Sequence, residues 1–156
     1  MKLLTQILYE QHPQESSQQE NHKTMRLAAG ILFYAKDTGK ILLVKRSAAS
    51  SCPHTWSLAG GKVDNKMEAR NPKLAARREA MEEIGFTTPV NLSLIHITKR
   101  PGFRFFNYLA IVPSEFSVTL NEEHTDAEWF DPETLPNPLH HGVEELFSHY
   151  HFPTTK

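Results

Sequence analysis

The stretch GGKVDNKMEARNPKLAARREAMEEIGF, residues 60–86, runs from a glycine pair into a segment with helical spacing and several glutamates. Pro72 is compatible with the first turn of a helix, where its missing N–H leaves no helical hydrogen bond unmade. Gly85 suits the left-handed position that ends many helices. We therefore predict a helix that begins near Pro72 and ends at Ile84.

The predicted helix has two unlike faces. At about 100° per residue, Glu79, Glu82 and Glu83 fall within an arc of roughly 100°. Most of the opposite arc is apolar, and we expect it to be buried: Leu74, Ala76, Ala80, Met81 and Ile84. Like charges three and four residues apart repel by roughly a few tenths of a kcal/mol, so a compensating cation is expected.

The context of the glutamates favours a metal site over the alternative, a solvated acidic face. Hard divalent cations bind oxygen ligands, and carboxylates on adjacent helical turns can converge on one or two ions. The glycine pair lets backbone approach closely. Arg77 and Arg78 supply part of the compensating charge. The order strand, Gly-Gly, loop and acidic helix therefore predicts a site for metal and phosphate.

Length and composition indicate one domain. The chain has 156 residues, of which 39% are hydrophobic, and this is enough for one core. The formal net charge of −1 argues against a specific nucleic-acid-binding module and against an anionic membrane surface. The single cysteine, Cys52, excludes an internal disulfide framework, and no apolar run is long enough to span a bilayer. We expect a cytoplasmic protein.

Composition also divides the chain. Residues 10–23 carry almost no apolar side chains, so residues 1–23 are predicted to be a tail or linker. The first nine residues are apolar enough to pack on the domain or on a neighbouring subunit, which leaves room for a homodimer, or they fray. A domain is expected over residues 24–150, followed by a short tail, 151–156.

Strand and helix signals alternate irregularly within the predicted domain. Apolar runs around the turn at 37–39 predict one hairpin, and the runs on either side of 101–102 predict another. Residues 55–63 predict one short strand ending at the glycine pair, and residues 142–150 have helical spacing. The order favours a mixed sheet flanked by helices over a doubly wound parallel sheet.

The segment REAMEEIGF, residues 78–86, resembles the second half of the motif of the Nudix hydrolases (MutT-like), Gly-x5-Glu-x7-Arg-Glu-U-x-Glu-Glu-x-Gly-U, where U is a bulky apolar residue. The preceding WSLAGGKV, residues 56–63, resembles the strand and loop that lead into it. The resemblance implies an α+β Nudix fold, in which a mixed β-sheet is sandwiched between α-helices (α/β/α) and carries a loop-helix-loop metal site.

The same resemblance implies a pyrophosphohydrolase that depends on Mg²⁺ or Mn²⁺ and cleaves a nucleoside diphosphate linked to another moiety. It assigns metal binding to Glu79, Glu82 and Glu83, with Glu68 as a further candidate ligand. Catalytic roles fall on Arg78, which orients the carboxylates, on Glu79 and on Glu123. Substrate binding is expected at Gly60, Gly61 and Lys62 beside the phosphates and at Arg104 and Phe106 beside the nucleobase. The rival function is a catalytically weak nucleotide-binding or regulatory domain on the same scaffold.

Two departures from the motif affect these assignments. Arg78 follows Gly61 by 17 residues where the motif requires 14, so the loop is three residues longer. Glu68 is the carboxylate nearest to the displaced motif position, and the alternative is a surface glutamate. Ala59 stands where the family usually has proline, which loosens the turn without removing a reactive group.

The segment NEEHTDAEWF, residues 121–130, resembles the late region that completes the metal site or supplies the base in this family. Glu123 is the best match and Glu122 the second, against the alternative of solvated loop residues. Trp129 and Phe130 are expected to anchor the following segment in the core rather than to stack on a base.

Overall fold

The computed structural model describes residues 25–152, so the predicted tail at 1–23 lies outside the described residues. The strands are β1 (Arg26–Ala35), β2 (Lys40–Arg46), β3 (Trp56–Ser57), β4 (Ala59–Lys62), β5 (Ser93–Arg100), β6 (Phe103–Val112) and β7 (His124–Phe130). The helices are α2 (Lys66–Arg70), α3 (Pro72–Ile84) and α4 (His141–His149).

The strands form one mixed sheet in which β1 is central. β6 runs parallel to β1 along its whole length, from the pair Arg26 and Phe103 to the pair Ala35 and Val112. The other edge of β1 is shared by two antiparallel partners, β4 near the start of β1 and β2 near its end. β5 pairs with β6, while β3 and β7 pair with β2. The prediction of a mixed sheet is confirmed.

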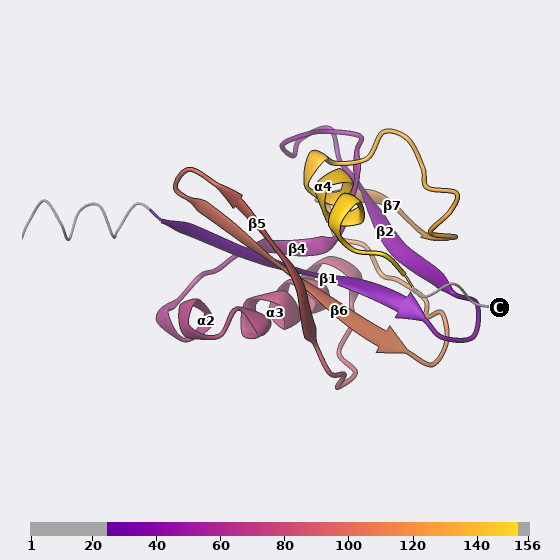
Figure 1. Ribbon diagram of the computed structural model, residues 1–156, viewed down its shortest axis with the longest axis horizontal. Helices are drawn as coiled ribbons and strands as arrows, with labels where there is room; N and C mark the ends of the chain where they lie inside the picture. Colours follow the sequence, from indigo (N-terminus) through magenta and orange to yellow (C-terminus); the bar gives the residue numbers. More distant parts are fainter. Residues whose placement is uncertain (1–24, 153–156) are drawn as a thin grey trace, which may run out of the picture.

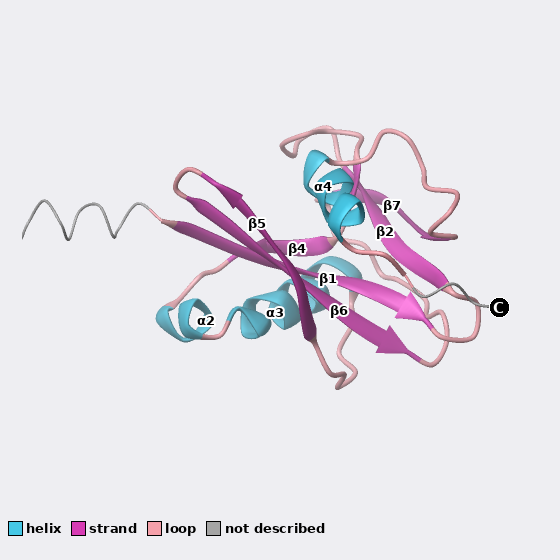
Figure 2. Cartoon of the chain, in the orientation of Figure 1, coloured by secondary structure: helices cyan, strands magenta, loops and turns pink. Residues whose placement is uncertain are grey.

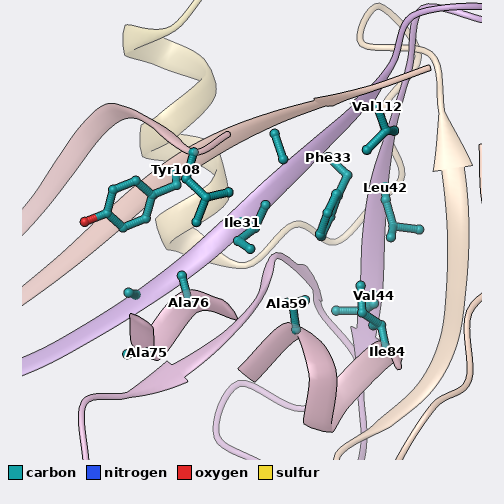
Figure 3. Close-up of a cluster of buried hydrophobic side chains, with 14 of the residues drawn as sticks. Ile31, Phe33, Leu42, Val44, Ala59, Ala75, Ala76, Ile84, Tyr108 and Val112 are labelled. Atoms are coloured by element: carbon teal, nitrogen blue, oxygen red, sulfur yellow. The ribbon is translucent and has the colours of Figure 1, made fainter. Parts of the chain in front are cut away.

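Helices cover both faces of the sheet, in the arrangement expected for α/β/α layers. α2 and α3 lie on one side of β1, and α4 lies on the opposite side (Figures 1 and 2). Each side has its own buried apolar cluster. The cluster under α3 includes Ile31, Phe33 and Ile84 (Figure 3), and the cluster under α4 includes Leu32, Leu43 and Leu146. Alternation along β1 sends successive side chains to opposite clusters.

The predicted limits of the acidic helix are confirmed. Pro72 occupies the first turn of α3, and Gly85 follows Ile84 in the left-handed conformation with φ of 72°. Backbone N–H groups at residues 85 and 86 bond the carbonyls of residues 81 and 80, so the last turn is closed.

The predicted buried face of α3 is wrong in part. Leu74 and Met81 are 38% and 51% exposed, whereas Ala75 and Glu83 are buried. α3 packs closely on β1 and β4, and the alanines and the glycines of β4 make this close approach feasible. The helix is therefore rotated so that small side chains and one glutamate face the sheet, and two large apolar side chains face outward.

Two further expectations about local structure are wrong. The single strand predicted over residues 55–63 is split at Leu58 into β3 and β4, because β3 pairs with β2 while β4 pairs with β1. The loop predicted between Lys62 and Pro72 contains the short helix α2, which Asn65 caps by accepting a hydrogen bond from Glu68 N. The two predicted hairpins are confirmed as β1–β2 and β5–β6.

The helices within residues 25–152 are too short and too polar for any of them to cross a bilayer. The predicted C-terminal helix is confirmed as α4. Trp129 and Phe130 are partly buried and pack against the two apolar clusters, as expected for anchors of β7.

The rotation of α3 can be tested with two truncations in the same helix. Ile84→Ala empties a fully buried site and is expected to lower the free energy of unfolding by about 2–5 kcal/mol. Leu74→Ala removes a partly exposed side chain and is expected to cost less than about 1 kcal/mol. Urea unfolding followed by circular dichroism measures both, and a larger loss for Leu74→Ala would contradict the observed orientation.

Candidate active site

Arg78 lies at the centre of the carboxylate cluster on α3. Its Nε and Nη2 atoms donate to the two oxygens of Glu68 at 2.9 and 3.0 Å. Nη1 donates to Glu79 at 3.0 Å and to Glu82 at 3.1 Å. Nη2 also bonds the Lys62 carbonyl at 2.8 Å. These acceptors fix the guanidinium and raise the pKa of Arg78, chiefly through the hydrogen bond to Glu68.

Glu68 lies next to Arg78 because the three-residue-longer loop folds into the short helix α2, which carries Glu68. Its side chain is 5% exposed and forms a two-pronged ion pair with Arg78. Asp64 N donates to the same carboxylate at 2.9 Å. The hydrogen bond from Arg78 is the main reason that the pKa of Glu68 is lowered. Glu68 is therefore a buried partner of Arg78 in this structure, and metal binding by Glu68 stays a prediction.

The glycine pair on β4 admits the acidic helix. A Cβ atom on Gly60 would lie 2.5 Å from Ala29 O and 2.6 Å from Gly30 Cα, so backbone occupies that space. A Cβ atom on Gly61 would lie 2.5 Å from the carboxyl group of Glu79. Gly60 is therefore required by the backbone of β1, whereas Gly61 leaves room for the carboxyl group of Glu79.

Glu83 is the most buried carboxylate of α3, with 2% of its surface exposed. Gly60 N donates to its Oε2 at 3.1 Å, and His124 Nδ1 lies 3.8 Å away. Within residues 25–152, neither Lys nor Arg forms an ion pair with it. Burial raises the pKa of Glu83 to about 9, which the Gly60 N–H opposes and the negative charges of Glu79 and Glu123 reinforce.

The other acidic side chains of the site, Glu79, Glu82 and Glu123, are more exposed than Glu83. The side chain of Glu79 is 12% exposed, and burial raises its pKa against the opposing effect of Arg78. The side chain of Glu82 is 48% exposed. Glu123 lies on the surface just before β7, and its carbonyl accepts from Ser47 N at 2.9 Å. The fold thus brings the three motif glutamates and Glu123 to one place.

The predicted substrate-binding residues lie in different settings. Lys62 is exposed at the end of β4, and its carbonyl, rather than its ammonium group, contacts Arg78. Arg104 and Phe106 are two positions apart on β6, so their side chains point to the same face of the sheet. Arg104 donates to the carbonyls of Arg100 and Phe103, and Phe106 packs against the cluster under α3.

Two residues at the site were not singled out from the sequence. Asp64 forms an ion pair with Arg78 at 3.3 Å. His124 is 6% exposed, and its Nδ1 has no hydrogen-bond partner among residues 25–152. Burial lowers the pKa of His124 to about 4, and Arg46 adds to the effect, so its ring is neutral at pH 7. The one feature of the sequence that could have pointed to His124 as a site residue is its position next to Glu123.

The residues present fit a hard divalent cation. Their donors are carboxylate oxygens, which Mg²⁺ and Mn²⁺ prefer. One guanidinium serves Asp64, Glu68, Glu79 and Glu82, so the cluster keeps an excess of acidic groups. Buried carboxylates of this kind are paired or hold metals when they are ionised. Glu83 has the most to gain from a cation, because Glu79 and Glu123 repel its charge and the described groups that oppose this repulsion are a backbone N–H and a neutral imidazole.

Comparison with known proteins agrees with this geometry. The family model of the NUDIX domain matches residues 24–150. The chain belongs to the Nudix family. Its α+β architecture is that of the Nudix fold, and the family together with its hydrolase neighbours identifies it as a pyrophosphatase-type hydrolase. Among curated proteins, the comparison gives no match.

Solved structures of Nudix proteins are similar to the chain. The MutT NUDIX hydrolase of Burkholderia pseudomallei is 25% identical with a TM-score of 0.63, over 80% of this chain and 96% of that one. The ORF135 protein of E. coli is 28% identical with a TM-score of 0.58, over 80% and 87%. An Ap4A hydrolase of C. elegans is 27% identical with a TM-score of 0.57, over 68% and 80%.

The two adjacent glycines are expected to respond differently to the same substitution. Gly60→Ala forces a methyl group against backbone and should lower the free energy of unfolding by about 1–3 kcal/mol. Gly61→Ala meets the flexible end of Glu79, so stability should change by less than about 1 kcal/mol. Gly61→Ala should instead weaken Mn²⁺ binding, measured by electron paramagnetic resonance. Unchanged Mn²⁺ affinity would contradict the contact with Glu79.

The pKa of Glu83 predicts how stability depends on pH without divalent cations. The folded chain holds a proton on Glu83 up to about pH 9, whereas the unfolded chain loses it near 4.5. The protonated Glu83 carboxyl group therefore contributes its full stabilisation below pH 4.5, and this stabilisation is lost as the pH rises toward 9. In buffer that contains a metal chelator, the free energy of unfolding of the wild-type protein should therefore fall between pH 7 and 9. The fall should be less steep for the Glu83→Gln variant. Equal slopes in urea titrations would contradict the raised pKa.

Proposed function

We propose that the chain is a divalent-metal-dependent pyrophosphohydrolase that cleaves a nucleoside diphosphate linked to a second moiety. The observation that carries the proposal is the convergence of Glu79, Glu82, Glu83 and Glu123 beside the glycine pair, with Arg78 bonded to Glu79 and Glu82. The excess of carboxylates favours Mg²⁺ or Mn²⁺, and the loop shaped by Gly60 and Gly61 is proposed to lie beside the phosphates of the substrate.

Metal binding is assigned to the three glutamates of α3. Glu82 and Glu83 are the principal ligands, and Glu79 completes the set from the previous turn. Arg78 orients these carboxylates through its bonds to Glu79 and Glu82. Glu68 holds Arg78 in place from the other side, which supports a positioning role for Glu68 in addition to the predicted role as a ligand.

The substrate is assigned to residues of β4 and β6, the strands that pair with the two edges of β1. Lys62 is exposed at the end of β4, and its ammonium group is proposed to contact a phosphate oxygen. Arg104 and Phe106 share one face of β6 and are proposed to hold the nucleobase by charge and by stacking. The Ap4A hydrolase among the similar structures supports including dinucleoside polyphosphates among the candidate substrates.

The reaction is hydrolysis of a phosphoanhydride. Water attacks one phosphorus atom, the bond from that phosphorus to the bridging oxygen breaks, and the departing phosphate takes the electron pair. Glu123 accepts the proton of the attacking water. Bound divalent cations would neutralise the charge that develops on the phosphate oxygens. Arg78 and the backbone at Gly60 keep the carboxylates in position while charge moves.

Charge removal at the metal ligands tests the proposal. Glu82→Gln and Glu83→Gln keep the shape of the side chain and should lower Mg²⁺-dependent turnover by at least about a hundredfold. Glu68→Gln is the comparison variant, and a smaller loss is expected because Glu68 acts through Arg78. The substrates are nucleotide sugars, dinucleoside polyphosphates, FAD, coenzyme A and nucleoside triphosphates. If the folded wild-type protein turns over no member with Mg²⁺ or Mn²⁺, the rival binding domain is favoured.

The role of Glu123 has its own kinetic signature. If Glu123 accepts the proton, Glu123→Gln should lower kcat by about a hundredfold or more while Mn²⁺ affinity stays near that of the wild type. Glu122→Gln is the matched control, because Glu122 is exposed on the same loop. Partial rescue of Glu123→Gln by raised Mn²⁺ would identify Glu123 as a ligand instead, and unchanged kinetics would remove it from the site.

A further inference from the structure

A second group of metal-binding side chains lies outside the carboxylate cluster. It joins Cys52, in the loop between β2 and β3, to His140 and His141 at the start of α4. Cys52 Sγ lies 3.8 Å from His141 Nδ1. One ligand atom from each of the three residues lies within 4.8 Å of the other two. Cys52 and His140 are half-buried and His141 is exposed.

Backbone contacts hold the two segments together. Trp56 N donates to Pro138 O at 3.0 Å, and His140 N donates to Trp56 O at 2.8 Å. The loop itself is held by Thr55 Oγ1, which bonds the Cys52 carbonyl at 2.7 Å, while Cys52 adopts a left-handed conformation with φ of 49°. The thiol therefore faces the helix start through fixed backbone rather than through a free tail.

We propose that Cys52, His140 and His141 form a site for a soft or borderline divalent cation of the Zn²⁺ type. One thiolate and two imidazoles are ligands that Zn²⁺ prefers, and they leave a fourth position for water. Tetrahedral bonds of about 2.3 Å to sulfur and about 2.0–2.1 Å to nitrogen place such ligand atoms roughly 3.5 Å apart. The Cys52–His141 separation of 3.8 Å is already close to this, and all three ligand atoms lie within 4.8 Å of one another.

His140 needs closer consideration because its Nδ1 also caps α4. It accepts a hydrogen bond from Gly142 N at 3.0 Å, and the ring stacks on His141 with centroids 4.2 Å apart. Binding a metal through Nδ1 replaces the capping bond and leaves Gly142 N–H to solvent.

The two proposed metal sites differ in chemistry. The cluster on α3 offers carboxylate oxygens for a hard cation, whereas this one offers sulfur and nitrogen. The proposed Cys52–His140–His141 site does not depend on the hydrolase function and is tested separately from it. Its structural consequence is a link between the loop that starts at Ser47, whose N–H bonds the Glu123 carbonyl, and the first turn of α4.

Co²⁺ is the probe, because a cobalt–thiolate bond gives a near-ultraviolet charge-transfer band that carboxylates do not produce. The full-length protein, reduced with a phosphine and freed of metal, is titrated with Co²⁺ and then with Zn²⁺. We expect the band to saturate at one Co²⁺ per chain, together with visible bands of tetrahedral intensity, and Zn²⁺ to displace both. No band, or a band that needs two chains per metal, would overturn the intrachain site.

Four variants separate the proposed site from other metal binding. Cys52→Ser should abolish the band, and His141→Ala should weaken Co²⁺ binding at least about tenfold. His140→Asn keeps a good helix cap for Gly142 while removing the imidazole, so weaker binding in this variant cannot be attributed to the cap. His149→Ala, an exposed histidine of the same helix, should leave the spectrum unchanged. Co²⁺ affinity unaltered in both His140→Asn and His141→Ala would refute the site.

Discussion

The structure of the acidic site depends on the guanidinium of Arg78. It bonds Glu68 of α2, the Lys62 carbonyl of β4 and two glutamates of its own helix, so one side chain joins three elements. Several N–H donors in a planar group allow this, and a lysine could not make the same set of bonds. Because Arg78 offers a single charge to several carboxylates, it positions them without neutralising them. The remaining negative charge is what a divalent cation would satisfy.

The second constraint is the close approach of α3 to β4. Small side chains on the helix and glycines on the strand bring Glu83 into the protein interior, where Gly60 N donates to it. The same face therefore contributes to the apolar core, through Ile84, and to the site, through Glu83. An acidic group in this position is costly to bury when ionised, which is the reason for its raised pKa. A cation bound beside Glu83 would therefore stabilise both the ionised carboxylate and the folded chain.

The third contribution to the site comes from the far end of the chain. β7 pairs with β2, and this pairing carries Glu123 and His124 to the end of α3. Asn121 N bonds the Glu83 carbonyl at 3.4 Å, so the loop before β7 is attached directly to the acidic helix. A strand that is distant in sequence thus supplies the last acidic side chain and a buried neutral imidazole. This arrangement divides the site between a helix and a loop.

The sequence by itself determined the limits of α3, the two hairpins, the mixed sheet and the family, because these depend on local signals: proline and glycine positions, apolar runs and motif spacing. It did not determine which face of α3 is buried. Alanine, leucine and methionine are all apolar, and only the packing of α3 against β1 and β4 decided that Leu74 and Met81 face outward. Nor did spacing determine the place of Glu68, since the longer loop puts it out of register. The short helix α2 and the ion pair with Arg78 decided it, and the ion pair joins residues ten positions apart on two different helices.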